Sequence, residues 1–281
     1  MEIIYQYDGT FDGFLCCVFH SYVEKELPVA IYCDEEFFSL YEVRNINTVP
    51  ENAGRVYRSI VRRSHKAADV VRRAFLTCLP EKEMHLLTLI RTLYAQGPAF
   101  LSNPADPACH DVYKALRHMG GELEKLRGFI RFSDYNGVLG AEIEPKNRVL
   151  PLLRHHFCSR YANESFFIYD RTNKEILLYS HGKSRIAPVD SLHLGRPGDE
   201  EVFYRTLWKK FYDTVAIEER RNPQCQNTFL PKRYRNTMTE FLPVTNPQTS
   251  SAGEIDRAVP DGKPVLATPA EYGQTAAGSG T

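Results

Sequence analysis

The sequence predicts an α+β protein, with a small α/β N-terminal unit and helices followed by antiparallel hairpins packed with amphipathic helices. Three observations predict this class. Short apolar segments alternate with a helical segment near the start, a regular helical period runs through residues 106–127, and two hairpin patterns follow. We expect an N-terminal α/β unit with a basic helical segment at 1–80, an α+β domain at 81–243 and a disordered tail at 244–281.

The first elements are short strands around one helix. Apolar and turn residues predict strands at residues 3–5, 29–32 and 40–43, with a helix over 11–26 that starts near Asp12 and Gly13. Residues 51–78 follow as a helical and basic segment. A further helix is predicted over 81–95, because Gly97 and Pro98 favour its end there.

The clearest helical period lies in residues 106–127. Five apolar residues recur there at spacings of three and four and form one stripe: Val112, Leu116, Met119, Leu123 and Leu126. This spacing predicts a helix packed against the core, and Gly128 is placed to end it. We interpret the stripe as core packing and not as a cofactor site.

Asn136-Gly137 predicts a tight hairpin, because a type I′ turn needs positive φ at both central residues. A two-residue loop fixes the register, so the numbers of opposed residues sum to 273. This register predicts three pairs: Ile130 with Ile143, Phe132 with Ala141, and Arg131 with Glu142. The first two pairs face the core and the third lies on the polar face.

A second hairpin is predicted from strands at 166–170 and 175–179 around the turn 171–174. Its strands carry consecutive apolar residues, which favours a central place in the sheet with both faces covered. Helices are expected at 151–161, 199–216 and 232–241. Residues expected to face inward on the last two are Tyr204, Trp208, Phe211, Val215, Tyr234, Met238 and Phe241.

The basic segment is the first candidate nucleic-acid interface. It contains seven basic residues and one acidic residue; the basic ones are Arg55, Arg58, Arg62, Arg63, Lys66, Arg72 and Arg73. As one helix, most of them line a single face. Alternatively, Ser64 caps a second helix and the segment forms a basic helix–turn–helix corner. Either arrangement suits phosphate contacts, and a solvated surface helix remains the alternative.

Two further groups are candidates for a phosphate site or an ion-pair network: His156 with Arg160, and Lys209 with Arg220 and Arg233. His156 and Arg160 share a helix face, whereas His155 and His156 point about 100° apart and are poorly placed to bind one metal ion. In an alternative enzymatic interpretation, Glu218 or Glu219 acts as a base, with Lys209, Arg220 and Arg233 as phosphate clamps.

Other functions are disfavoured by missing motifs. The seven scattered cysteines form no C-x-x-C pair, and no metal-ligand, P-loop or dinucleotide pattern occurs, so we expect no metal and no cofactor. Equal numbers of basic and acidic residues, 35 each, mean that binding to a polyanion depends on local clusters. With no signal-peptide pattern and no long apolar run, we expect a cytoplasmic protein that does not contact the membrane.

Several segments, in order along the chain, resemble one known family. They include Asp8–Leu15, Gly128–Phe132, Ala141–Pro145, Val149–Leu153, His156-Phe157, Ile168–Asp170, Leu207–Tyr212, Ile217–Pro223 and Leu230–Tyr234. Over about residues 1–243 the chain resembles the family of DNA-metabolism proteins that contain the domain of unknown function 4130. Family members usually have an aromatic residue where this chain has Arg235, so the local packing there is expected to differ.

The resemblance implies a biological process and a partner protein, and it does not specify a reaction. It implies a partner, a radical S-adenosylmethionine protein of DNA repair or modification, and in some relatives the domain is fused to a uracil-DNA glycosylase. We therefore expect an accessory, DNA-directed protein that acts with such a partner. A nucleic-acid-processing enzyme that uses residues 209–235 is the alternative.

Overall fold

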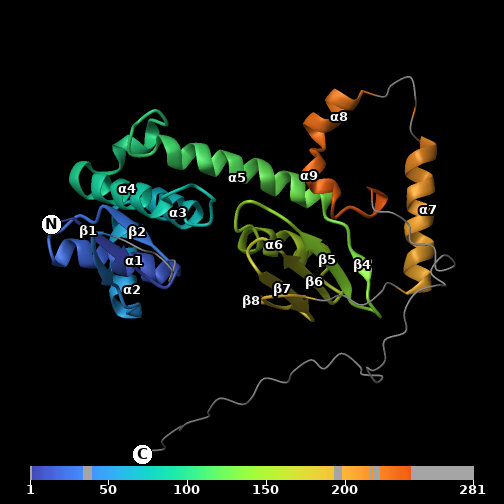
Figure 1. Cartoon of the computed structure of the whole chain (residues 1–281), viewed down its shortest axis with the longest axis horizontal. Coiled ribbons are helices and arrows are strands. Elements are labelled where there is room, and N and C mark those ends of the chain that lie inside the picture. Colours follow the sequence, from blue (N-terminus) through green and yellow to red (C-terminus); the bar gives the residue numbers. More distant parts are fainter. Residues whose placement is uncertain (1, 34–39, 193–197, 216, 218–221, 242–281) are drawn as a thin grey trace, which may run out of the picture. The chain divides into compact units, whose positions relative to one another are not determined.

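The computed structural model of the chain describes residues 2–33, 40–192, 198–215, 217 and 222–241 (Figure 1). The predicted tail at 244–281 lies outside the described residues. Within them, two sheets and their covering helices build two hydrophobic cores. The expected α+β class is confirmed.

The N-terminal sheet has three parallel strands in the order β2-β1-β3. Its central strand is β1 (Ile3–Gln6), between β2 (Ala30–Tyr32) and β3 (Glu42–Asn45). Parallel neighbours need a crossover, and α1 (Phe11–Val23) supplies it between β1 and β2. Thr10 caps this helix by accepting a hydrogen bond from the Gly13 N–H.

The basic segment forms two helices. α2 (Pro50–Arg63) ends at Ser64, whose extended backbone (φ −165°, ψ 117°) cannot continue a helix. The Ser64 hydroxyl then accepts from the Ala67 N–H and starts α3 (His65–Ala74). The two-helix interpretation is therefore confirmed, and the single-helix interpretation is wrong. α4 (Lys82–Gln96) completes the N-terminal layer and ends at Gly97, as predicted.

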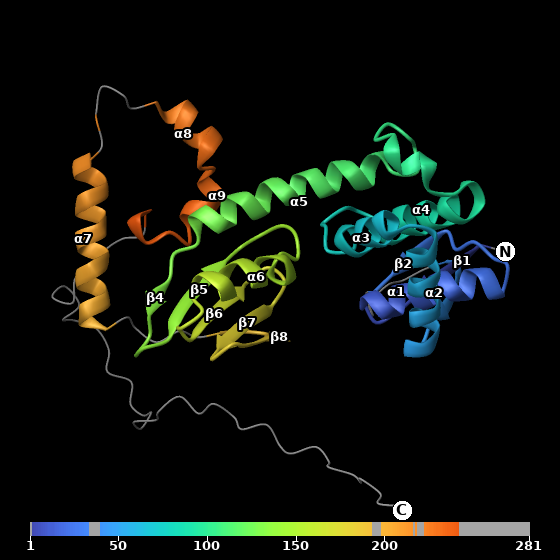
Figure 2. The same ribbon diagram turned by 180° about the vertical axis from the view of Figure 1, so that it is seen from behind.

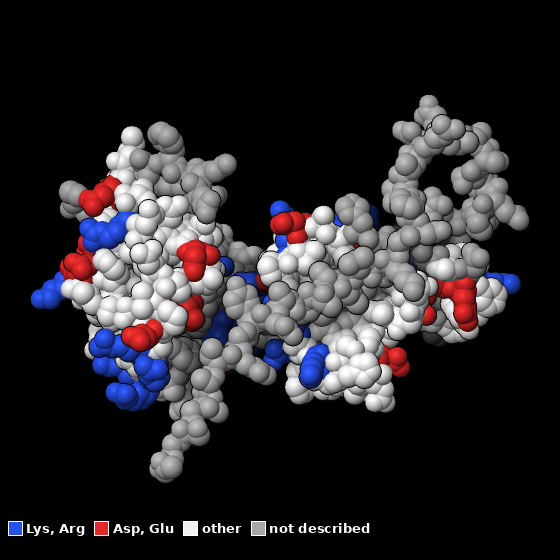
Figure 3. Space-filling model, turned by 90° about the horizontal axis from the view of Figure 1, so that it is seen from below, with Lys and Arg blue, Asp and Glu red and all other residues white. Residues whose placement is uncertain are grey.

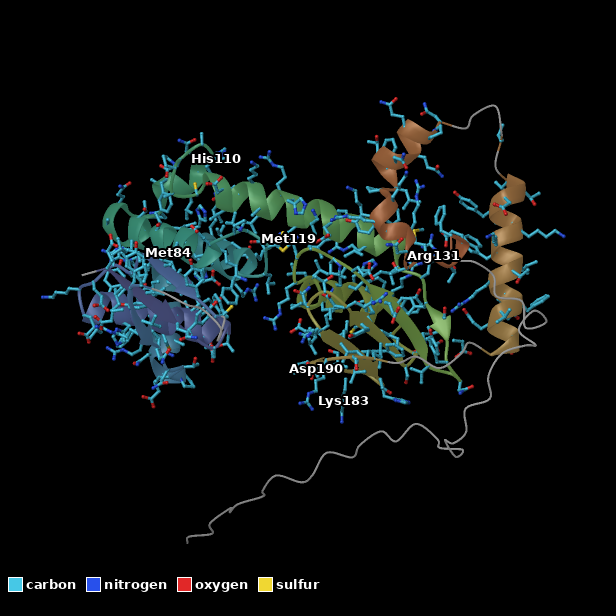
Figure 4. All side chains as sticks on the ribbon, in the orientation of Figure 1. Met84, His110, Met119, Arg131, Lys183 and Asp190 are labelled. Carbon is cyan, nitrogen blue, oxygen red and sulfur yellow. The ribbon has the colours of Figure 1, made fainter. Side chains whose placement is uncertain are left out.

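The long helix α5 (His110–Phe129) contributes to both cores. It follows a 3-10 segment at Pro98–Ser102. The helix contacts both α4 and α6 (Figure 2). Val112 is buried in the first core and Met119 in the second. Met84 of α4, which packs against the first core, and Met119 are labelled in Figure 4. The predicted stripe is confirmed, since four of its five residues are buried and Leu116 packs against both cores. The helix passes Gly128 and ends one residue later than predicted.

The second sheet has five strands in the order β4-β5-β6-β7-β8. They are β4 (Ser133–Asp134), β5 (Leu139–Ile143), β6 (Phe166–Asp170), β7 (Glu175–Ser180) and β8 (Lys183–Pro188). β6 and β7 form the predicted central hairpin, although Leu178 remains 41% exposed on one face. β5 and β6 are parallel and joined through α6 (Leu150–Arg160), and β8 was not predicted.

The Asn136-Gly137 turn is confirmed, with φ of +56° and +85° and mutual hydrogen bonds between Tyr135 and Val138. The two pairs that form, Ser133 with Gly140 and Asp134 with Leu139, keep the predicted sum of 273. The predicted pairs beyond them are wrong, because β4 begins only at Ser133. Arg131 therefore does not oppose Glu142; its Nη2 lies 2.9 Å from Glu240 Oε1.

The C-terminal helices are α7 (Asp199–Val215), α8 (Pro223–Phe229) and α9 (Lys232–Arg235), followed by a 3-10 turn at Thr239–Phe241. Tyr234 and Met238 are buried as predicted. The inward placement of four α7 residues is wrong: Tyr204, Trp208, Phe211 and Val215 are all more than 40% exposed. Periodicity identifies an apolar face, but the described chain packs only a few residues against this helix.

A buried polar network holds the second sheet to α5 and α9. Glu122, only 2% exposed, accepts from the Lys146 and Asn147 N–H groups, from Asn147 Nδ2 (2.6 Å) and from Arg233 Nη2 (3.0 Å). Arg148 forms an ion pair with Glu175. Asp170 is fully buried and accepts from the Thr172 and Asn173 N–H groups and from Asn173 Nδ2.

The turn geometry makes a testable comparison between two glycines. Gly137 needs positive φ, whereas Gly121 lies on an exposed face of α5 and an added Cβ would meet nothing within 4 Å. Gly137→Ala should lower the free energy of unfolding by about 1 kcal/mol, and Gly121→Ala should raise it by up to about 1 kcal/mol. Urea denaturation measures both, and equal signs would contradict the turn assignment.

The buried carboxyl makes a prediction about pH. Burial raises the pKa of Asp170 to about 6, against the opposing effect of its three N–H donors. The folded state then binds this proton more tightly than the unfolded state, so the contribution to stability is lost as pH rises from about 4 through 6. Relative to Asp170→Asn, the wild type should lose up to about 3 kcal/mol of unfolding free energy between pH 4 and pH 7.5.

Denaturation at several pH values measures this difference. Asp213→Asn, at an exposed position on α7, serves as the control and should show no such trend. A constant difference between wild type and Asp170→Asn over this range would contradict the raised pKa.

Candidate nucleic-acid interface

Eight residues of α1, α2 and α4 form a surface that we call the arginine–aromatic strip. It consists of Phe19, Tyr22, Arg55, Arg58, Arg62, Arg63, Arg91 and Tyr94. The four arginines of α2 fall within an arc of about 140° at 100° per residue. The buried residues Ala53, Val56 and Ile60 occupy the other side of this helix and hold it against the first core.

Three of the five arginines of the strip lie over aromatic rings. The Arg55 guanidinium carbon is 5.6 Å from the Phe19 ring centroid, that of Arg63 is 4.9 Å from Tyr94, and that of Arg91 is 5.1 Å from Tyr22. The rings of Tyr22 and Tyr94 meet edge to face at 5.5 Å. Arg63, Tyr94, Tyr22 and Arg91 therefore form one row of contacts across α1, α2 and α4, in which the two rings lie between the two cations.

The charges of the strip are not compensated by acidic residues of the described chain. None of its five arginines forms an ion pair there, whereas other arginines, such as Arg44 and Arg148, do. Burial raises the pKa of Tyr22, against the opposing effect of the Arg91 charge. In Figure 3, Lys and Arg side chains gather at the lower left, on the N-terminal part of the molecule.

This arrangement combines two properties that single-stranded nucleic acids require. Uncompensated guanidinium groups attract phosphates, and aromatic rings with neighbouring arginines give bases a flat surface on which to stack. Tyr22 is 41% exposed and is therefore accessible to a base. Arg58 and Arg62 form no hydrogen bond or ion pair among the described residues and remain available to phosphates.

The other three basic residues of the segment, Lys66, Arg72 and Arg73, interact with groups outside the strip. The Lys66 ammonium donates to the Leu101 carbonyl at 2.9 Å. Arg72 and Arg73 lie 3.4 and 3.7 Å from the Asp69 carboxylate, one turn earlier on α3. The structure therefore brings together Arg55, Arg58, Arg62 and Arg63, and it leaves the other three outside the strip because α3 starts in a new direction at Ser64.

Half of the strip was not predicted from the sequence. Arg91 and Tyr94 are three residues apart on α4, and Phe19 and Tyr22 have the same spacing on α1, so each pair shares a helix face. This spacing was visible in the sequence. Nothing in the sequence, however, indicated that the two faces meet beside α2.

A second candidate is a cleft of about 500 Å³ between α7 and the ends of α5 and α6. Its lining includes Arg160, one of the predicted residues, and Arg131, which is labelled in Figure 4. The other arginines that line it are Arg127 and Arg205, and its aromatic residues include Phe132, Tyr161 and Trp208.

The other predicted phosphate-site residues do not come together with Arg160. Arg233 belongs to the Glu122 network, and Lys209 lies half-buried on α7 without a described partner. His156 is not part of the cleft lining; its buried Nε2 has no described hydrogen-bond partner, and burial, with Arg127 and Arg160, lowers its pKa. Glu218, Glu219 and Arg220 lie outside the described residues.

No group of three or more His, Cys, Asp or Glu side chains suited to a metal ion lies within the described part of the chain. Its free cysteines are Cys16, Cys17, Cys33, Cys78, Cys109, Cys158 and Cys225. None of the described helices combines the length and the apolar composition that a bilayer crossing requires.

Comparison with family models identifies the family of this chain. No curated protein matches the chain. The model of one family, described as a domain of unknown function (DUF4130), matches residues 80–240, which is more than half of the chain. The matched region contains the whole cleft and, of the strip, only Arg91 and Tyr94. This chain therefore belongs to the DUF4130 family.

Proposed function

We propose that this protein is an accessory, DNA-directed component of DNA metabolism or repair, which binds single-stranded nucleic acid through the arginine–aromatic strip. One observation carries the proposal: five arginines on adjoining helices have no carboxylate partner among the described residues, and three of them lie over aromatic rings. A near-neutral chain gains its attraction for a polyanion from such a local cluster.

Solvation is the simpler explanation of a single exposed arginine, but it does not account for this pattern. A solvated guanidinium needs no ring beneath it, whereas the strip holds Arg63 both over Tyr94 and by a hydrogen bond to the Tyr94 carbonyl (3.2 Å). Arginines fixed in this way lose less side-chain entropy when they bind phosphate. The strip is thus preorganised for an anionic, stackable ligand.

The accessory role rests on the resemblance to DNA-metabolism proteins that act with a radical S-adenosylmethionine protein or are fused to a uracil-DNA glycosylase. In this proposal the chain supplies nucleic-acid binding, and the partner supplies the chemistry. The partner contacts a surface other than the strip, because the strip is occupied by nucleic acid in the working complex.

Two double substitutions test the strip with matched charge loss. Arg58→Gln with Arg62→Gln removes two unpaired cations, and Arg72→Gln with Arg73→Gln removes two that are paired with Asp69. In anisotropy titrations of a labelled single-stranded oligonucleotide at several salt concentrations, the first pair should reduce the logarithmic salt slope by about 1.4. The second pair should change the slope little.

The comparison has a clear negative outcome. If both double variants change the slope equally, attraction is diffuse and the strip is not the interface. If the wild type shows no salt-dependent binding at low ionic strength, the nucleic-acid role itself is wrong. Thermal unfolding of both variants checks that the fold is kept, which is expected because all four side chains lie at the surface.

The accessory role predicts a stable contact with a catalytic protein. The tagged chain, purified from native extract, should retain a radical S-adenosylmethionine protein or a uracil-DNA glycosylase after nuclease treatment, as identified by mass spectrometry. Loss of this protein on nuclease treatment would mean that nucleic acid bridges the two, and its absence from untreated samples would contradict the proposed partnership.

A further inference from the structure

The cleft beside α7 is separate from the strip, because the two share no residue. α7 is attached to the second sheet by the Arg205 hydrogen bond to Ser133 Oγ and by the bond from the Asp134 N–H to Glu201 (3.2 Å). Farther along, Tyr212 meets the Phe241 ring at 5.7 Å. Between these attachments, α7 leaves space instead of packing closely on α5 and α6.

Aromatic rings from both sides line this space. On the α6 side, Phe132 and Tyr161 meet at 4.9 Å between centroids and are held by the rings of the second core. From α7 come Tyr204 and Trp208, which are 56% and 42% exposed. Such rings favour a flat, apolar ligand with polar edges.

Charge pairing identifies one free cation among the arginines of the cleft. Arg127 pairs with Glu124, Arg131 with Glu240 and Arg205 with Glu201, at 2.6, 2.9 and 2.7 Å. Arg160 has no ion pair among the described residues and lies 5.9 Å from the Tyr161 ring centroid. The cleft therefore offers one uncompensated positive charge next to an aromatic ring.

We propose that this cleft takes one unstacked nucleotide of a single-stranded nucleic acid, with its base on the rings of Tyr161 and Trp208 and its phosphate at Arg160. The inference rests on the proposed DNA-directed function and names the ligand of a second site. The volume of about 500 Å³ is within the range of small-ligand sites and excludes a stacked duplex. A base inside a duplex has no exposed face, so only an unstacked base can enter.

Trp208 is the only tryptophan of the chain, so its fluorescence reports directly on the cleft. The full-length protein is titrated with thymidine monophosphate, with a short oligothymidylate, with a duplex of matched length and with inorganic phosphate. The monophosphate and the oligothymidylate should quench Trp208 saturably. The duplex and inorganic phosphate should not, because neither presents a free base.

A matched pair of variants locates the phosphate. Arg160→Gln should weaken thymidine monophosphate binding about tenfold or more, as loss of a charge-assisted hydrogen bond does. Lys209→Gln removes the same charge next to Trp208, at a residue that does not line the cleft, and should leave the affinity unchanged. Equal effects of the two substitutions would overturn the phosphate assignment.

The outcomes separate this inference from the function on which it rests. If the Arg58/Arg62 double variant flattens the salt slope but no nucleotide quenches Trp208, the strip stands and the cleft proposal is wrong. If thymidine monophosphate quenches Trp208 in that double variant as in the wild type while the slope is unchanged, the cleft stands and the strip is wrong. Equal quenching by the duplex would refute the need for an unstacked base.

Discussion

The carboxylate of Glu122 is buried in the middle of α5 and is surrounded by four N–H donors from two separate segments. An unpaired buried charge costs several kcal/mol, whereas a carboxylate with this many donors is compensated. Because the donors come from the segment 146–147 before α6 and from Arg233 of α9, this one group fixes both relative to α5. The C-terminal ends of α5 and α6 and Thr239 after α9 in turn line the cleft. Asn147 connects the same network to Asn173 and Asp170.

Ion pairing, and not the number of positive residues, decides which basic side chains of this chain are available to a ligand. The basic segment is dense in arginine, yet Asp69 neutralises part of it and the Leu101 carbonyl holds Lys66. In the cleft, three of four arginines have carboxylate partners, so among the residues that the structure describes a lining rich in arginine offers a single free charge. The strip is different because three of its five arginines are held by rings, which orient a guanidinium without cancelling its charge.

Local patterns predicted most of the elements and few of the long-range contacts. The α5 stripe, the Asn136-Gly137 turn and the central hairpin depend on residues close in sequence, and all three are confirmed. Arg131 was assigned to Glu142 because the register was extended beyond β4; its true partner, Glu240, is 109 residues away. The strip residues on α1 and α4 were not predicted either, because they meet α2 only through contacts between segments far apart in the sequence. The α7 stripe shows the converse limit, since periodicity identifies an apolar face and does not say what covers it.

The family match divides the two sites between different parts of the chain. The cleft is built entirely from residues within 80–240, whereas the strip draws six of its eight residues from the preceding segment. A protein that contains only the matched domain therefore has the chain segments of the cleft and lacks most of the strip. If both proposals hold, the capture of an unstacked nucleotide is the property that such a domain can carry alone. The N-terminal α/β unit then adds affinity for the phosphate backbone. When one site of the protein holds a nucleic-acid strand, the effective concentration of that strand at the second site is raised, so the two sites together bind more tightly than either alone.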